Sequence, residues 1–248
     1  MTPSFEIVAH RGVPTELPEN TIPSFRRAVE LGADAIELDV RLTQDQIPIV
    51  YHYFYLNEGT TAAGPVFNFT FAEIQNLEIK DSAGNPEQNC RIPTLHEVLE
   101  TFGGRIGFEI EIKGPEPESS RVVGAVLCNF EHLWDTIEIT SYEPMLLADV
   151  QQRCPGLATD LLFPRSEDWM GLDVVAYAAV HRARLAGARA VHLHPTQLTH
   201  EVVAAVRSFG LEVHAWEVDD RESLRQMMEL DIPRICTNKL HEAVAFRR

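Results

Sequence analysis

The 248-residue chain lacks a run of about 18 apolar residues, the length that a membrane-spanning helix requires. Its first residues, Met1 to Glu6, contain neither the basic stretch nor the apolar stretch of a secretory signal peptide. We therefore predict no stable membrane insertion and a cytoplasmic location.

Cysteine is also scarce. The four cysteines are widely spaced and none forms a C-x-x-C pair: Cys90, Cys128, Cys154 and Cys236. Apolar residues make up 45% of the chain, which is enough to build a core without a disulfide framework. We predict reduced thiols, as expected in the cytoplasm.

Basic residues are too few to balance the acidic ones. The chain has 21 Lys and Arg against 37 Asp and Glu, and its formal net charge is −16. This average field repels nucleic acids and anionic membrane surfaces, so we expect no nucleic-acid partner. An anionic small-molecule substrate would need local Arg and Lys side chains or a metal ion.

The chain alternates short apolar strands with longer segments of helical period, and no G-x-G-x-x-G follows the first strand. Strands are predicted over 7–9, 35–42, 47–51, 106–112, 137–140, 158–161, 190–193, 213–218 and 234–237, and helices over 22–31, 94–102, 119–130, 144–153, 169–186, 199–209 and 221–230. This alternation predicts a parallel sheet, either a doubly wound open sheet or a closed barrel.

The length fits one TIM-type (β/α)8 barrel domain over residues 1–248. The nine predicted strands exceed eight by one, and a hairpin between 35–42 and 47–51 accounts for the surplus as an irregularity. Residues 53–93 are rich in Gly, Asn, Pro and Thr, and only 71–77 has a helical pattern. We predict that this segment is a small insertion after the hairpin.

Carboxylates alternate with apolar residues on two predicted strands. Glu37 and Asp39 share one strand face, and Glu109, Glu111 and Lys113 share a face of another. Inside a barrel, such carboxylates need a compensating cation, and hard divalent ions prefer oxygen ligands. The alternatives are a solvated strand face for the first set and an internal ion pair of Lys113 for the second.

Histidines end two predicted strands. His10 and Arg11 follow the first strand, and His52 ends the strand over 47–51. Reactive residues of α/β barrels stand at the carboxyl ends of strands. Two imidazoles can share the roles of general base and acid near neutral pH, and Arg11 can bind an anion. His192 and His194 share a face of a later strand and approach the same site if that face is inward.

Several motifs in this order resemble the glycerophosphodiester phosphodiesterase family, within the superfamily of the phosphoinositide-specific phospholipases C. The matching segments are His10-Arg11-Gly12, Glu19-Asn20-Thr21, Gly32-Ala33-Asp34-Ala35-Ile36-Glu37-Leu38-Asp39-Val40, Thr43 to His52, Ile92-Pro93-Thr94-Leu95, Glu111-Ile112-Lys113 and the strand with Trp216. The resemblance extends over almost the whole chain.

This resemblance implies a somewhat irregular TIM-type barrel that hydrolyses glycerophosphodiesters to an alcohol and glycerol 3-phosphate. It implies one divalent cation, Mg²⁺ or Ca²⁺, on Glu37, Asp39 and Glu111, with Glu109 ranked below Glu111. It makes His10 and His52 the catalytic pair, and it implies that Arg11 and Lys113 hold phosphate oxygens. Glu19 would orient a histidine or touch glycerol, and Trp216 would stack on the glycerol backbone or fill the core.

The chain departs from the family pattern near the expected barrel mouth. Tyr53 follows His52 where the family has Asp, Glu217 and Asp219 replace Thr and Asn after Trp216, and Asn238 stands where the family has Asp. Two alternatives follow from these departures. One is a phospholipase D-like phosphodiesterase acting on lysophospholipids, and the other is a non-catalytic barrel that binds phosphorylated ligands. The aromatic stretch around Tyr53 is a loop packed on the core or a platform for a choline-like group.

Overall fold

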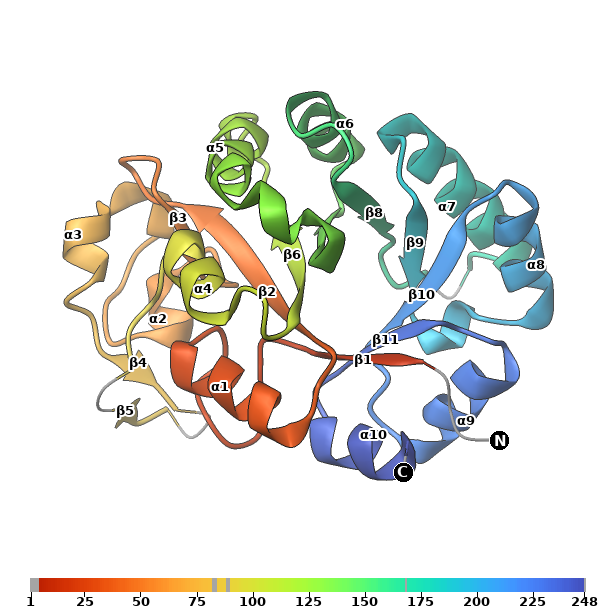
Figure 1. Ribbon diagram of the computed structural model, residues 1–248, viewed down its shortest axis with the longest axis horizontal. Helices are drawn as coiled ribbons and strands as arrows, with labels where there is room; N and C mark the ends of the chain where they lie inside the picture. The colour runs from red at the N-terminus through yellow and green to blue at the C-terminus, as the bar shows by residue number, and fades with distance from the viewer. Residues whose placement is uncertain (1–4, 82–83, 88–89, 168, 248) are drawn as a thin grey trace.

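The computed structural model describes residues 5–81, 84–87, 90–167 and 169–247. Within these residues, eight parallel strands form a closed ring (Figure 1). They are β1 (Glu6–Ala9), β2 (Ala35–Leu42), β6 (Gly107–Ile112), β7 (Ile137–Ser141), β8 (Ala158–Leu162), β9 (Ala190–Leu193), β10 (Glu212–Trp216) and β11 (Arg234–Thr237). The ring closes because β1 pairs with β11 on one side and with β2 on the other. The predicted TIM-type barrel is confirmed.

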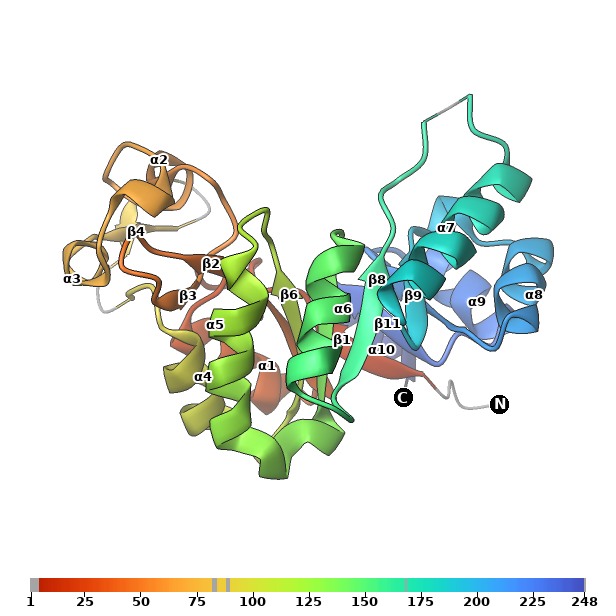
Figure 2. The ribbon, with the colours of Figure 1, turned by 90° about the horizontal axis from the view of Figure 1, so that it is seen from above.

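Helices surround this ring of strands (Figures 1 and 2). They are α1 (Ile22–Leu31), α4 (Leu95–Phe102), α5 (Glu118–Leu127), α6 (Pro144–Arg153), α7 (Leu172–Ala186), α8 (His200–Ser208), α9 (Arg221–Glu229) and α10 (Leu240–Arg247), with the 3₁₀ segments η2 (Cys128–Thr136) and η3 (Pro195–Gln197). No helix in the described part of the chain is both long and apolar enough to span a membrane.

Side-chain alternation on the strands separates an apolar outer face from a polar interior. On β2, Ile36 and Leu38 belong to the main hydrophobic core, which the surrounding helices cover. Glu37 and Asp39 are equally buried but belong to the opposite face of the strand. The same alternation on β6 puts Ile110 in the core. The sheet therefore carries its carboxylates into the barrel interior.

The extra strand is β3 (Pro48–Val50), which pairs antiparallel with β2, so the predicted hairpin is confirmed. After it, the chain forms α2 (Leu56–Gly59), η1 (Val66–Asn68), α3 (Phe71–Ile74) and a small sheet of β4 (Ile79–Lys80) and β5 (Pro86–Glu87). This segment has its own cluster of buried apolar residues and lies beside the barrel (Figure 2). That residues 1–248 form a single domain, with 53–93 as its insertion, stays a prediction.

Several predicted element bounds are wrong. The helix predicted over 119–130 ends at Leu127, because the chain tightens into η2 with a non-helical Phe130. The helix predicted from Trp169 begins at Leu172, after Gly171 in extended conformation. α2 and α10 were not predicted. α2 is only four residues long, and the residues of α10 show little separation of apolar from polar faces.

Gly12 allows the chain to turn closely over α1 after β1. Its φ angle is +89°, and a Cβ at this position would lie 2.9 Å from the backbone carbonyl carbon of Ser24. The Ser24 hydroxyl in turn accepts a hydrogen bond from the Val13 backbone amide at 2.7 Å. The glycine is therefore required both by conformation and by space.

We predict that Gly12→Ala lowers the free energy of unfolding more than Gly32→Ala does. Gly32 has a similar φ of +86°, but a Cβ there would meet no atom within 4 Å. Both variants bear the cost of left-handed backbone, about 1–2 kcal/mol. Only Gly12→Ala adds a clash, which should cost at least about 1 kcal/mol more. Urea denaturation measures both values, and equal losses would contradict the steric explanation.

Candidate active site

Residues on or just after several strands of the ring line one cavity of about 180 Å³ at the carboxyl ends of the strands. β1 leads into His10 and Arg11, β2 carries Glu37, and β6 carries Glu111 and leads into Lys113. The lining residues are His10, Arg11, Glu37, His52, Glu109, Glu111, Lys113, Tyr142, Leu162, Trp216, Glu217 and Cys236. Both predicted histidines therefore face the same cavity as the predicted carboxylates.

Three carboxylates converge at this cavity. Glu37, Asp39 and Glu111 each offer one oxygen, and these oxygens lie within 4.8 Å of one another. All three residues are buried, and the register of β2 with β6 places Asp39 beside Glu111. An oxygen-only set suits Mg²⁺ or Ca²⁺. Asp39 Oδ1 is buried without a hydrogen bond, which is consistent with a cation ligand.

Like charges shift the protonation of this group. Burial raises the pKa of Glu37 well above its usual value, and the neighbouring Asp39 raises it further. Burial also raises the pKa of Glu111 to about 7, although Lys113 opposes the shift. Burial acts in the same direction on Asp39, but Arg11 and Lys113 outweigh it and lower the pKa of that carboxyl. Burial and the repulsion between neighbouring carboxylates therefore favour the protonated forms of Glu37 and Glu111.

Two side-chain cations partly compensate the carboxylates. Lys113 Nζ lies 2.9 Å from Glu111 Oε1 and 3.4 Å from Asp39 Oδ1, so the internal ion pair considered for Lys113 is present. Arg11 Nε lies 3.1 Å from Asp39 Oδ2, and Arg11 Nη1 lies 3.2 Å from Glu19 Oε2. Glu19 thus contacts Arg11 and, within the described residues, makes no hydrogen bond to a histidine.

Backbone strain and an asparagine hold these groups in place. Arg11 has a φ of 54°, which is unusual for a residue with a side chain, and its amide donates to Glu37 Oε2 at 3.0 Å. Asn20 donates from Nδ2 to Asp39 Oδ2 at 2.8 Å, and its Oδ1 accepts from the Asp39 amide. Asn20 was not predicted as a site residue, although the Glu19-Asn20-Thr21 motif contained the signal.

His10 is held by a chain of hydrogen bonds. Its Nε2 lies 3.8 Å from Glu37 Oε2, and its Nδ1 lies 2.6 Å from Asn238 Oδ1. Asn238 donates from Nδ2 to Asp219 Oδ2 at 2.8 Å, and its backbone amide donates to Asp219 Oδ1. Because Nδ2 is engaged, Asn238 presents its oxygen to His10, which places the imidazole proton on Nδ1.

The family pattern has Asn where this chain has Asp219, and Asp where this chain has Asn238. The carboxylate and the amide have therefore exchanged places. The two side chains are hydrogen-bonded to each other, so the departures are a matched pair. Sequence reasoning identified both departures but not their contact, because 18 residues and α9 separate them along the chain.

His52 lies two residues after the end of β3 and lines the cavity together with His10. Arg41 Nε donates to its backbone carbonyl at 2.8 Å, while its buried Nδ1 has no hydrogen-bond partner. Burial lowers the pKa of His52 to about 3, although Asp39 opposes the shift. Burial and Arg11 also lower the pKa of His10. Both imidazoles are therefore neutral near pH 7 when the cavity holds no anion.

Aromatic side chains form one wall of the mouth. Trp216 donates from Nε1 to the His192 carbonyl at 3.3 Å and meets Tyr142 edge-on, with ring centroids 6.2 Å apart. In the aromatic stretch after the hairpin, Tyr51 is buried while Phe54 is about half exposed. The stretch therefore combines core packing with an exposed rim.

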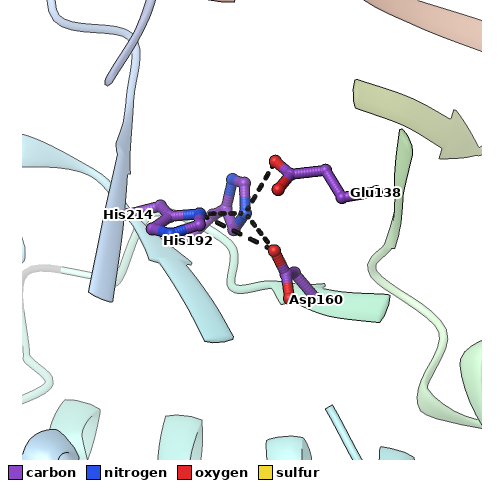
Figure 3. A group of neighbouring side chains, drawn as sticks. All are labelled: Glu138, Asp160, His192 and His214. Carbon is purple, nitrogen blue, oxygen red and sulfur yellow. Dashed lines mark hydrogen bonds and ion pairs between the residues drawn. The ribbon is translucent and has the colours of Figure 1, made fainter. Parts of the chain in front are cut away.

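The other predicted candidates lie elsewhere. Glu109 lines the cavity, but its Oε1 lies 3.4 Å from His192 Nδ1 and it is not part of the three-oxygen cluster. His192 is buried in the barrel interior with Glu138, Asp160 and His214 (Figure 3). His194 accepts from the Thr196 amide and so caps η3. Neither histidine lines the cavity, but each contacts a residue that does: the His194 ring lies 5.8 Å from the Trp216 ring between centroids, and His192 contacts Glu109. A role of the two histidines at the site stays a prediction.

The closed ring of eight parallel strands, with the candidate site at their carboxyl ends, defines a TIM-barrel protein. The model of the glycerophosphoryl diester phosphodiesterase family matches residues 10–242. The chain therefore belongs to this family and has glycerophosphodiester phosphodiesterase activity.

Similar proteins of this family align with nearly the full length of the chain. The glycerophosphodiester phosphodiesterase of Caldanaerobacter subterraneus subsp. tengcongensis is 34% identical, over 94% of this chain and 93% of that protein. A Bacillus subtilis glycerophosphodiester phosphodiesterase is 30% identical, over 93% and 82%. The crystal structure of the Agrobacterium tumefaciens enzyme aligns with a TM-score of 0.80 at 26% identity, covering 97% of this chain and 99% of that one.

The fold is shared with a phosphodiesterase of Oleispira antarctica, whose structure was solved in complex with the product sn-glycerol-3-phosphate. That structure aligns with a TM-score of 0.83 at 22% identity, over 97% of this chain and 96% of that chain.

We predict that Asp219→Asn lowers kcat about 10- to 100-fold. The new amide would oppose the amide of Asn238 and turn its oxygen away from His10, and small displacements of a catalytic group have effects of this size. The exchange of both residues, Asp219→Asn with Asn238→Asp, should restore kcat to within a few-fold of wild type. Steady-state kinetics with thermal melts as a folding control measure this, and a double variant no better than the single one would contradict the matched pair.

Proposed function

We propose that the protein hydrolyses glycerophosphodiesters to an alcohol and glycerol 3-phosphate, with a divalent cation on Glu37, Asp39 and Glu111. The observation that carries this proposal is the convergence of three buried carboxylate oxygens at the cavity that His10 and His52 line. The product bound by the Oleispira antarctica protein of the same fold supports the choice of product.

The cation, Mg²⁺ or Ca²⁺, would supply positive charge for the phosphoryl oxygens and activate a nucleophile. The chain's own residues do the remaining work. Lys113, held between Glu111 and Asp39, places its ammonium group where it can bind a phosphate oxygen. Arg11 contributes a second positive charge at the same edge, and Glu19 fixes its guanidinium group.

The two imidazoles move the protons. His10 carries its proton on Nδ1, held by Asn238, so its Nε2 has the free lone pair of a general base. His52 would then protonate the leaving alkoxide. The negative charge of a diester beside His52 would favour the charged imidazolium form that His52 needs in order to donate a proton.

Trp216 is proposed to bind the glycerol backbone, supported by its position in the cavity wall beside Tyr142. The partner is a small-molecule phosphodiester, and the net charge of −16 supports the absence of a nucleic-acid partner. The scattered cysteines, free in the structure, support the proposed cytoplasmic location.

We predict that chelation abolishes turnover of glycerophosphocholine and glycerophosphoethanolamine, and that Mg²⁺ or Ca²⁺ restores it. Glu111→Gln removes one ligand charge and should raise the metal concentration for half-maximal activity at least about tenfold. Glu118→Gln on the surface of α5 is the matched control. Coupled detection of glycerol 3-phosphate gives the rates, and full turnover in excess chelator would refute the metal requirement.

We predict that His10→Ala and His52→Ala each lower kcat about 10²- to 10⁴-fold, the usual contribution of general acid–base catalysis. His96→Ala, on the exposed face of α4, should leave kcat unchanged. Product analysis by mass spectrometry separates the alternatives. Lysophosphatidic or cyclic phosphate from a lysophospholipid would indicate the phospholipase D-like activity, and no product from any substrate would indicate a non-catalytic barrel.

A further inference from the structure

A second group of metal-ligating side chains lies inside the barrel, away from the three-oxygen cluster. Glu138, Asp160, His192 and His214 come from the adjacent strands β7, β8, β9 and β10, and all four are at most 3% exposed. The parallel register pairs His192 directly with His214. Figure 3 shows the four side chains pointing toward a common centre.

The donor atoms have the spacing of a tetrahedral site. His192 Nε2 lies 3.1 Å from His214 Nδ1, 3.4 Å from Asp160 Oδ2 and 3.9 Å from Glu138 Oε1. His214 Nδ1 lies 3.6 Å from Asp160 Oδ2, and all four atoms are within 4.8 Å of one another. Ligands bonded to Zn²⁺ at 2.0–2.1 Å in a tetrahedron are separated by about 3.3–3.4 Å. Small side-chain movements therefore suffice for binding.

Each histidine also has a carboxylate behind it. The other ring nitrogen of His192, Nδ1, lies 3.4 Å from Glu109 Oε1, and the other ring nitrogen of His214, Nε2, lies 3.4 Å from Glu212 Oε2. Metal-ligating histidines usually donate their second N–H to a carboxylate in this way, because the contact fixes the tautomer and the ring orientation. Both rings thus direct their other nitrogen at the common centre.

The carboxylates retain lone pairs for a metal. Arg189 Nη2 contacts Glu138 Oε2 and Asp160 Oδ2, each at 2.7 Å. Glu138 Oε1 is buried without a hydrogen bond, although Arg234 Nε lies 3.1 Å away. Each carboxylate oxygen has two acceptor sites, so the arginine contact leaves Asp160 Oδ2 able to bind a metal.

One of the four side chains, Glu138, borders a pocket at the opposite end of the barrel from the candidate active site. A pocket of about 390 Å³ is lined by Glu138, Arg189 and Arg234 together with Gly107 and Ala158, the first residues of β6 and β8. This pocket therefore opens at the amino-terminal ends of the strands, whereas the catalytic cavity opens at their carboxyl ends.

We propose that Glu138, Asp160, His192 and His214 bind one Zn²⁺ ion, or a transition-metal ion of the same ligand preference, at a site separate from the catalytic cation. Two imidazoles and two carboxylates suit Zn²⁺, whereas the all-oxygen set suits Mg²⁺ or Ca²⁺. Four protein ligands leave no open position for substrate, so the ion has a structural role that links β7 to β10.

The test uses the full-length protein, stripped with chelator and re-equilibrated with limiting ZnCl₂ in millimolar Mg²⁺, which keeps the three-oxygen site filled. We expect one Zn²⁺ per chain by plasma mass spectrometry, and with CoCl₂ the intense visible absorption of four-coordinate Co²⁺. Asp39→Asn, which removes a ligand of the catalytic set, should retain the same stoichiometry. Absence of Zn²⁺ from both proteins would overturn the proposal.

Two variants locate the ion. His214→Asn preserves the shape near Nδ1 but removes the imidazole, and should weaken Zn²⁺ binding at least about 100-fold in competition with a chromophoric chelator. The side chain of Glu212, the carboxylate behind His214, is 54% exposed. Glu212→Gln removes only the charge of this carboxylate and should weaken Zn²⁺ binding about 10- to 100-fold. Circular dichroism checks folding. If His214→Asn does not fold, the Zn²⁺ affinity of Glu212→Gln alone tests the site. A folded variant of either kind that binds Zn²⁺ with wild-type affinity overturns the proposal.

Discussion

The main physical constraint on this protein is the burial of like charges inside a closed sheet. Strand alternation directs apolar side chains outward to the helices and carboxylates inward, as on β2 and β6. Buried carboxylates are costly unless cations or protons compensate them. The barrel therefore positions cationic side chains beside each carboxylate group, and both the catalytic cavity and the second cluster follow from that requirement.

The barrel interior divides its acidic residues into two chemically different groups. Toward the carboxyl ends, the donors are oxygens only, and Lys113 and Arg11 share the cavity with them. Deeper, two imidazoles join two carboxylates, with arginines at the outer side. Glu109 connects the groups, because it lines the catalytic cavity and contacts His192. The two groups therefore match the ligand preferences of different classes of metal ion.

The departures from the family pattern concentrate around His10 and the mouth. Asp219 and Asn238, which both differ from the family pattern, are hydrogen-bonded to each other, so the amide of Asn238 contacts His10 and the carboxylate of Asp219 stands behind that amide. Glu217 adds a carboxylate to the cavity lining. None of these departures falls on Glu37, Asp39 or Glu111.

The amino-acid sequence by itself predicted the order of the barrel strands, most of the helices between them, the hairpin and several residues that line the candidate cavity, because alternation and ordered motifs are local properties of the chain. It did not determine the short α2, the end of α5, the contact of Asp219 with Asn238 or the group around His192. Those depend on which strands become neighbours when the ring closes. His214 showed no pattern of its own in the sequence, and only the register of β9 with β10 brought it to His192.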